Sequence, residues 1–241
     1  MSAVLLVARR ELSSYFRGTL GYVIVAGMLL LDGLLFHGLA LGTGKHLSSE
    51  VLRAFFHFSF GVTSAAGILL TMRLFAGETR DETLVLLYTA PISDWQIVLG
   101  KWLSAFAFVL LLIGLTFYMP LMVAVNGSVH PGHVAAGYLG LVLVGAASTA
   151  IGLFTSSLTK HQLVAGIFGG ITLIALVVMW LLAKVAGPPI DSVFGYLSMY
   201  DKHFVPFSKG VVHSRDLVYY VSLTFLALVM TRVVVGARRW R

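Results

Sequence analysis

Long apolar runs alternate with short polar segments along most of the chain. Six of these runs are nearly free of charge, and a helix of about 18 or more residues is long enough to cross a hydrocarbon core of roughly 30 Å. The spans are predicted near residues 20–41, 55–75, 99–124, 134–156, 163–184 and 216–236. The pattern predicts an all-α integral membrane protein, with residues 1–241 forming a single transmembrane domain.

Two shorter segments have their own periodicity. Residues 2–17 carry apolar side chains at three- and four-residue spacing and polar ones between them, which predicts an interfacial helix. Its apolar members are Leu5, Ala8, Leu12, Tyr15 and Phe16, and its polar members are Arg9, Arg10, Ser13 and Arg17. Gly18 and Gly21 weaken helical continuity after it, although a cytosolic extension of the first span is an alternative. The aromatic-rich residues 193–212 predict one or two short helices on the outer side, before the last span.

Composition excludes a water-soluble protein. Hydrophobic residues make up 58% of the chain and charged residues only 11%, so the apolar surface requires lipid. The net charge of +7 could suggest a nucleic-acid partner, but the basic residues cluster at the ends of apolar runs. Membrane lipids with anionic headgroups are therefore the expected counter-charge, and no nucleic acid is expected.

The distribution of basic residues predicts the orientation. With six spans both termini lie on one side, which carries eleven lysines and arginines against six on the other side. Because the more basic side faces the cytoplasm, we expect both termini to be cytoplasmic and the protein to be multi-pass in the cytoplasmic (inner) membrane.

The connection from Met72 to Lys101 is the most polar part of the chain. It holds six charged residues from Arg73 to Asp94. A charged stretch at residues 78–82 is followed by an apolar stretch, then by Pro91 and by Ser93, which is a candidate helix N-cap. This order predicts two short amphipathic elements, and the length favours a docking role over a solvated connector.

The residues of this connection resemble a known family. The matching positions are Arg73-Leu-Phe-Ala, Glu78, Arg80, Thr83, Leu86-Leu87, Thr89, Pro91 and Gln96-Ile-Val-Leu-Gly-Lys101; further matches are Gly137-Tyr-Leu-Gly-Leu, Ala150-Ile-Gly-Leu-Phe-Thr-Ser-Ser-Leu-Thr159 and Arg215-Asp-Leu-Val-Tyr-Tyr-Val-Ser222. Together they resemble ABC-2 type transporter permeases, closest to the gliding-motility-associated branch. Gly77, Glu82 and His213 depart from the usual pattern of that family.

The resemblance implies a division of labour between subunits. Residues 76–95 would form the cytoplasmic coupling segment, with Glu78, Arg80 and Thr83 at the contact with a separate ABC ATPase and Pro91 ending the element. A second permease protomer, the same or a related chain, would complete the assembly, and an outer-side accessory subunit is a further expected partner. ATP and Mg²⁺ would belong to the ATPase, so this chain would be no enzyme and hold no cofactor. Export of a lipid-like or amphipathic substrate by alternating access would be its function.

Other polar residues suggest sites in or beyond the membrane. Asp32 and His57 lie within apolar runs, either on a transport pathway or, for Asp32, as a protonated or hydrogen-bonded carboxyl between helices. By the same resemblance, His203, Phe204 and Phe207 belong to an outer-side segment that caps the pathway, and membrane anchoring is the alternative. His130 and His133 provide two imidazoles without a third ligand, so no metal site is expected.

The sequence also bears on two other function classes, an intramembrane protease and a membrane scaffold or channel. An intramembrane protease lacks support, because no histidine lies at suitable depth beside Ser148, Ser156 or Ser157. A membrane scaffold or channel subunit without ATP coupling is the stronger alternative, but it leaves the charged connection after the second span unexplained.

Overall fold

The computed structural model describes residues 3–41, 48–82, 92–127, 129–187 and 190–239, and within them every regular element is helical. The helices are α1 (Ala3–Arg17), α2 (Thr19–Leu35), the π-helix η1 (Phe36–Leu41), α3 (Ser48–Thr71), α4 (Ala76–Arg80), α6 (Asp94–Leu115), α7 (Tyr118–Asn126), α8 (Pro131–Leu158), α9 (Gln162–Val185), α10 (Ile190–Leu197), α11 (Val205–Ser208) and α12 (Ser214–Arg239). Six stretches of the described chain are long and apolar enough to cross a membrane. The predicted all-α architecture with six spans is therefore confirmed.

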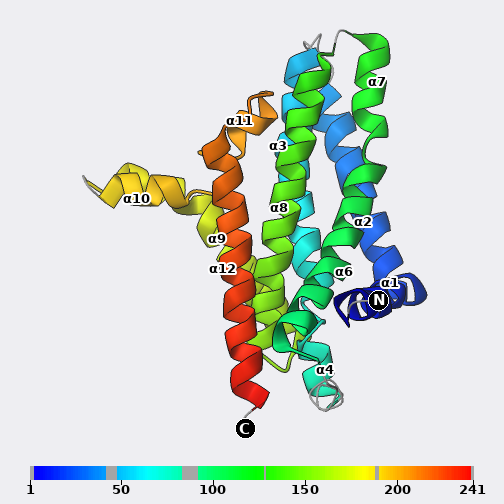
Figure 1. Ribbon diagram of the computed structural model, residues 1–241. Coiled ribbons are helices and arrows are strands. Elements are labelled where there is room, and N and C mark those ends of the chain that lie inside the picture. Colours follow the sequence, from blue (N-terminus) through cyan, green and yellow to red (C-terminus); the bar gives the residue numbers. More distant parts are fainter. Residues whose placement is uncertain (1–2, 42–47, 83–91, 128, 188–189, 240–241) are drawn as a thin grey trace.

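The helix α8 lies at the centre of the bundle. It packs most extensively against α3 and α12 (Figure 1). Both termini lie at one end of the bundle, together with α1 and α4, whereas α7 and α11 lie toward the other end (Figure 1). We call these the terminal end and the distal end.

Small residues allow the central helices to approach closely. A Cβ added to Gly67 of α3 would lie 2.3 Å from the Ser148 Oγ of α8, and one added to Gly152 of α8 would lie 2.1 Å from the Thr71 Oγ1 of α3. In a membrane, where lipid tails are as apolar as leucine, such close packing is a main source of helix association. Larger side chains at Gly67 or Gly152 would therefore force α3 and α8 apart.

The third span is bent rather than continuous. Its first part, α6, begins at Asp94 with the predicted N-cap, because the Ser93 hydroxyl accepts from Gln96 N and the Gln96 side chain accepts from Ser93 N. The helix is interrupted at Thr116 and Phe117 and continues as α7. Pro120 has no N–H to donate to the carbonyl four residues earlier, which explains a break at that position.

The N-terminal helix is separated from the first span by a sharp corner. Gly18 is extended between α1 and α2, and a Cβ at Gly21 would lie 2.2 Å from the Tyr15 carbonyl oxygen. The apolar face of α1 is divided: Ala8 and Tyr15 are buried against the bundle, whereas Leu5 and Phe16 are 49% and 44% exposed. This division fits a helix that lies between protein and lipid.

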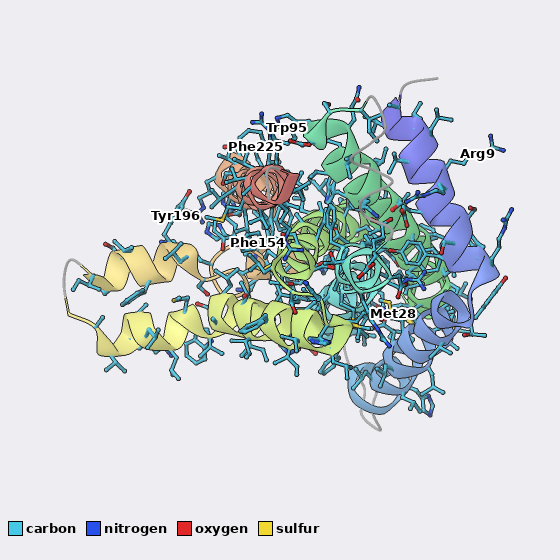
Figure 2. All side chains as sticks on the ribbon, turned by 90° about the horizontal axis from the view of Figure 1, so that it is seen from below. Arg9, Met28, Trp95, Phe154, Tyr196 and Phe225 are labelled. Atoms are coloured by element: carbon cyan, nitrogen blue, oxygen red, sulfur yellow. The ribbon has the colours of Figure 1, made fainter. Side chains whose placement is uncertain are left out.

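The helices α9 and α10 project sideways from the bundle as an antiparallel pair (Figure 2). Only Ala165, Gly169 and Leu173 of α9 are buried, and no residue of α10 is buried. The rest of α9 presents a broad apolar surface to lipid or to another subunit.

Candidate functional site

The short helix α4 lies at the terminal end, directly after the second span. Its first turn is held by Ser156 of α8, whose Oγ accepts from the backbone N–H groups of Phe75 and Ala76, both at 3.1 Å, and donates to the Met72 carbonyl at 2.9 Å. One hydroxyl thus satisfies donors that a helix start leaves without partners.

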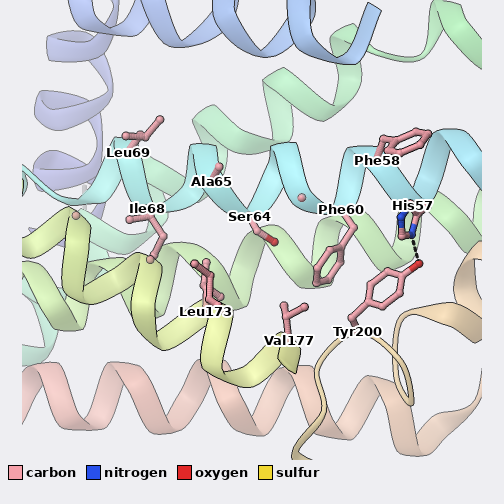
Figure 3. Close-up of a pocket in the computed structure, with 14 residues that line it drawn as sticks. His57, Phe58, Phe60, Ser64, Ala65, Ile68, Leu69, Leu173, Val177 and Tyr200 are labelled. Carbon is pink, nitrogen blue, oxygen red and sulfur yellow. Dashed lines mark hydrogen bonds between the residues drawn. The ribbon is translucent and has the colours of Figure 1, made fainter. Parts of the chain in front are cut away.

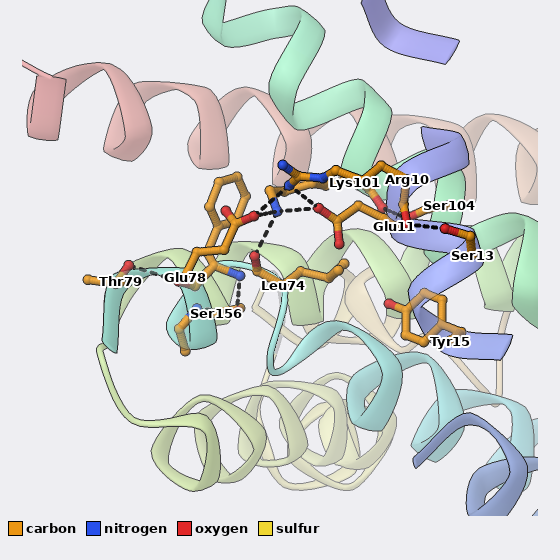
Figure 4. Close-up of polar contacts among 12 residues, drawn as sticks. Arg10, Glu11, Ser13, Tyr15, Leu74, Glu78, Thr79, Lys101, Ser104 and Ser156 are labelled. Atoms are coloured by element: carbon orange, nitrogen blue, oxygen red, sulfur yellow. Dashed lines mark hydrogen bonds and ion pairs between the residues drawn. The ribbon is translucent and has the colours of Figure 1, made fainter. Parts of the chain in front are cut away.

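A buried lysine joins α4 to the neighbouring helices (Figure 4). Lys101 of α6 has no exposed surface, and its Nζ lies 2.8 Å from Glu78 Oε1, 3.0 Å from Glu11 Oε1 and 2.9 Å from the Leu74 carbonyl oxygen. Arg10 completes the cluster, with its Nη2 at 2.6 Å from Glu11 Oε1 and 2.8 Å from Glu78 Oε1. Two cations and two carboxylates therefore connect α1, α4 and α6.

Glu11 and Arg10 of this cluster keep their charges at neutral pH. Burial alone would raise the pKa of Glu11, but the positive charge of Lys101 and the hydrogen bonds from Arg10 and Lys101 outweigh it and lower that pKa. Burial alone would lower the pKa of Arg10, but the negative charges and hydrogen bonds of Glu11 and Glu78 outweigh burial and raise that pKa. Taking such groups out of water is costly unless each has its partner, and here each carboxylate meets two cations.

The far side of α4 is exposed. Arg80, Asp81 and Glu82 face away from the bundle, while the Arg238 guanidinium of α12 donates to Thr79 Oγ1 at 3.3 Å. Of the four residues predicted for ATPase coupling, Glu78 therefore faces the charge cluster and Arg80 faces outward. Thr83 and Pro91 lie outside the described residues.

Several residues of this junction were not predicted from sequence as site residues. Lys101 was predicted only as a basic residue at the start of the third span and as a position of the family resemblance, and Arg10 was placed on the polar face of an interfacial helix. A lysine inside an otherwise apolar run is the one local signal that a buried carboxylate partner exists. Nothing local in the sequence indicates that the partners are Glu11 and Glu78.

A cleft lies between α3 and α9 (Figure 3). Its volume is about 620 Å³, and its walls are almost wholly apolar, with Phe60 and Ile68 on α3 and Leu173 and Val177 on α9. The Ser64 hydroxyl of α3 lines it, is buried, and has no hydrogen-bond partner among the described residues. At the distal end of the cleft, His57 Nδ1 contacts the Tyr200 hydroxyl. Burial raises the pKa of the Tyr200 phenol, and the tautomer of His57 decides which of the two groups donates the hydrogen bond.

The two predicted intramembrane polar residues do not share a site. His57 lines the α3–α9 cleft, whereas Asp32 of α2 is 2% exposed and its Oδ1 accepts from the Ser59 hydroxyl of α3 at 3.2 Å. Asp32 thus has a hydrogen-bonded carboxyl at the α2–α3 interface, and its role on a transport pathway stays a prediction.

A comparison with protein families adds the decisive observation. The model of the ABC-2 family transporter proteins matches residues 22–201, a range that contains α4 and both helices of the cleft. The chain belongs to this family. Its members are the membrane-spanning components of ABC transporters and are not themselves catalytic, and the match does not distinguish the gliding-motility-associated branch. No curated protein matches the sequence.

In this ABC-2 family member, the segment before the last span is tied to the distal end. Phe204 and Phe207 are fully buried, and a Cβ on Gly140 of α8 would lie 2.8 Å from Phe207 Cβ. His203 is buried between two acceptors, with Nε2 at 2.9 Å from the Tyr196 carbonyl and Nδ1 at 2.8 Å from Asp216 Oδ1. Because a carbonyl can only accept, Nε2 donates to the Tyr196 oxygen, and Nδ1 contacts the Asp216 carboxyl group.

The distal histidines of α8 have structural partners. His130 Nδ1 accepts from Gly132 N at the start of the helix, and His133 Nε2 lies 2.8 Å from the Ser208 carbonyl oxygen. Among the residues that the structure describes, no group of three or more histidines or carboxylates is placed to hold a metal ion.

Proposed function

We propose that this chain is the permease subunit of an ABC exporter and that α4 is its docking element for a separate ATPase. The observation that carries the proposal is the position of α4, which presents Arg80 outward while its inner side is bonded to α1, α6, α8 and α12. A partner that moves α4 would move several spans at once.

The bonds of α4 support a route for that movement to the cleft. The helix follows α3 after a single turn and contacts α9, and these are the two helices that line the cleft. Closure of two ATPase subunits on ATP would shift α4 between two positions, and the cleft would open alternately to the two sides of the membrane. ATP and Mg²⁺ belong to the ATPase in this proposal.

The character of the cleft supports a lipid-like or amphipathic substrate. Its apolar walls accommodate hydrocarbon, while Ser64 and the His57–Tyr200 pair offer hydrogen bonds at separate heights. In the assembled transporter we place two permease protomers, identical or related, in the inner membrane with their termini in the cytoplasm. An outer-side accessory subunit would contact the segment containing His203, Phe204 and Phe207, and assignment to the gliding-motility-associated branch stays a prediction from sequence.

Co-purification with a co-expressed ABC ATPase from the same organism tests the docking assignment. Arg80→Glu reverses an exposed charge on α4 without entering the buried cluster, so the complex should weaken at least tenfold while the permease itself stays folded. ATP hydrolysis by the remaining complex should no longer respond to the permease.

Lys209→Glu is the matched control, because it reverses an exposed charge at the distal end. It should leave the complex intact. If Arg80→Glu and Lys209→Glu bind the ATPase as well as wild type does, α4 is not the docking element. If wild type binds no ATPase, a scaffold or channel without ATP coupling becomes the better account.

A further inference from the structure

A second cavity lies at the corner between α1 and the first span. Its volume is about 460 Å³, and it is lined by Arg10, Ser13, Ser14, Arg17, Gly18 and Arg73. The lining thus contains three guanidinium groups and two hydroxyls, and none of it is acidic. A hollow with this lining is complementary to a compact anion.

Two of the three positive charges of the cavity, those of Arg17 and Arg73, are not cancelled from within the described chain. The nearby carboxylates of Glu11 and Glu78 are already engaged by Lys101 and Arg10. For Arg17 and Arg73, no ion pair exists within the described residues. The Arg73 guanidinium instead lies over the Tyr15 ring, 4.9 Å from its centroid, which holds it at the wall of the cavity.

The surroundings of the cavity indicate where the anion comes from. The amphipathic helix α1 ends here and the first span begins at Gly21, so the cavity lies where a span leaves the hydrocarbon. Next to it, Phe16 on α1 and Tyr22 and Val23 on α2 are exposed apolar side chains. A phosphate in the cavity would therefore place attached acyl chains along α2, and a free phosphate would leave that apolar surface unused.

We infer that this cavity, formed by Arg17, Arg73, Arg10 and the two serines, binds the phosphate headgroup of an anionic phospholipid. Guanidinium groups recognise phosphate through paired N–H donors, and serine hydroxyls add donors at the rim. The inference goes beyond the proposed transport function, because the lipid here is a bound component of the protein and not its cargo.

Binding to the purified chain in neutral detergent tests the site. Phosphatidylglycerol and phosphatidylcholine are titrated separately, and bound lipid is counted by native mass spectrometry. Wild type should retain phosphatidylglycerol in preference to phosphatidylcholine. Because a basic residue at a membrane surface contributes about fivefold in affinity, Arg17→Gln with Arg73→Gln should weaken phosphatidylglycerol binding roughly 25-fold.

Arg9→Gln is the matched control. Arg9 lies on the same helix but extends away from the bundle (Figure 2), so the substitution removes the same charge outside the cavity and should leave binding unchanged. If the double variant does not fold, the single variants carry the test, each with about a fivefold loss.

Three results would overturn the inference. One is phosphatidylglycerol binding by the double variant that equals that of wild type. Another is competition by millimolar inorganic phosphate that removes the lipid entirely, which would assign the cavity to a free anion. The third is loss of ATPase co-purification in the double variant with lipid binding intact, which would assign the arginines to a protein partner.

Discussion

Lys101 is a fully buried cation whose three acceptors come from two segments distant in sequence: Glu11 on α1, and Leu74 and Glu78 just before α4 and within it. Its hydrocarbon stem fits an apolar helix, and its ammonium also lies 5.2 Å from the centroid of the Phe75 ring. The Lys101 side chain therefore connects the amphipathic N-terminal helix α1 to α4 through its bonds to both.

Replacing Lys101 by methionine should be strongly destabilising. Glu11 and Glu78 would each lose one of the two cations that the described residues place beside them, and removing one member of a buried ion pair costs about 3–5 kcal/mol. Thermal unfolding of the purified protein measures the loss as a lower midpoint. Lys160→Met removes an exposed lysine and should have almost no effect. Equal midpoints for the two variants would show that the cluster contributes nothing to stability.

Glu82 is the described non-glycine residue with a left-handed backbone, at φ 56°. It stands where the family resemblance leads one to expect glycine, so the structure gives a physical reason for that usual choice. A side chain in this conformation costs about 1–2 kcal/mol.

Glu82→Gly should therefore stabilise the end of α4. Amide hydrogen exchange of residues 76–82 should slow by about fivefold, because local opening would no longer relieve strain. Asp81→Gly is the contrasting variant, since Asp81 has φ −86° and glycine there only adds freedom to the unfolded chain. Faster exchange in Glu82→Gly than in wild type would refute the strain argument.

Individual residues show that contacts between near neighbours in sequence can be predicted, whereas contacts between distant positions cannot. Ser93 was predicted as an N-cap and is one, because capping depends on neighbours within four residues. The Arg10–Glu78 pair spans 68 positions, and no local pattern encodes it. The unpartnered Ser64 hydroxyl in the cleft was likewise beyond prediction, since a serine in an apolar helix usually bonds its own backbone.

At the scale of elements, the segment between α10 and α12 is held to α12 by several polar contacts and by aromatic packing. The His203 ring stacks on Tyr219, with centroids 3.9 Å apart and planes at 11°. The Tyr219 and Tyr220 hydroxyls donate to the Leu197 and Met199 carbonyls at 2.8 Å each. Backbone groups of an irregular segment are thereby satisfied, as burial requires.

Asp216→Asn should loosen this segment without affecting the terminal end. The contact between His203 and the Asp216 carboxyl group would weaken, and losing a buried hydrogen bond to a charged group costs about 1.5–3 kcal/mol, so exchange of amides in residues 198–210 should accelerate roughly 10- to 100-fold. Exchange in α4 should stay unchanged. Asp201→Asn, at an exposed carboxylate of the same segment, serves as the control. If both variants exchange alike, the His203–Asp216 contact does not hold the segment.

The helices themselves were largely predictable, because the length of an apolar run can be read directly from consecutive residues. All six spans were found, as were the amphipathic α1 and the short helices before the last span. The break at Thr116 within the third span was not predicted, although Pro120 provided a signal. The sideways projection of α9 and α10 was also missed, since sequence hydropathy does not distinguish a helix packed in the bundle from one leaning away from it.

At the scale of the whole molecule, the bundle has two chemically different ends. The terminal end carries the charge cluster and the exposed α4 residues, whereas the distal end carries buried aromatic rings and the His203–Asp216 contact. An ATPase that uses cellular ATP can reach only one side of the membrane, so the proposed function requires the terminal end to face the cytoplasm. The excess of lysine and arginine on that side is in accord with this requirement.

Single cysteines can test this orientation cleanly, because the chain contains no native cysteine. Arg80→Cys marks α4 at the terminal end, and Lys209→Cys marks the distal end; both side chains are exposed, so each new thiol should react readily where reagent is present. A membrane-impermeant maleimide added to intact spheroplasts should label Lys209→Cys within minutes and Arg80→Cys only after lysis. The cysteine-free parent reports background. The reverse pattern would place α4 outside the cell, where no ATP-driven subunit could dock on it, and would exclude the coupling role for that helix.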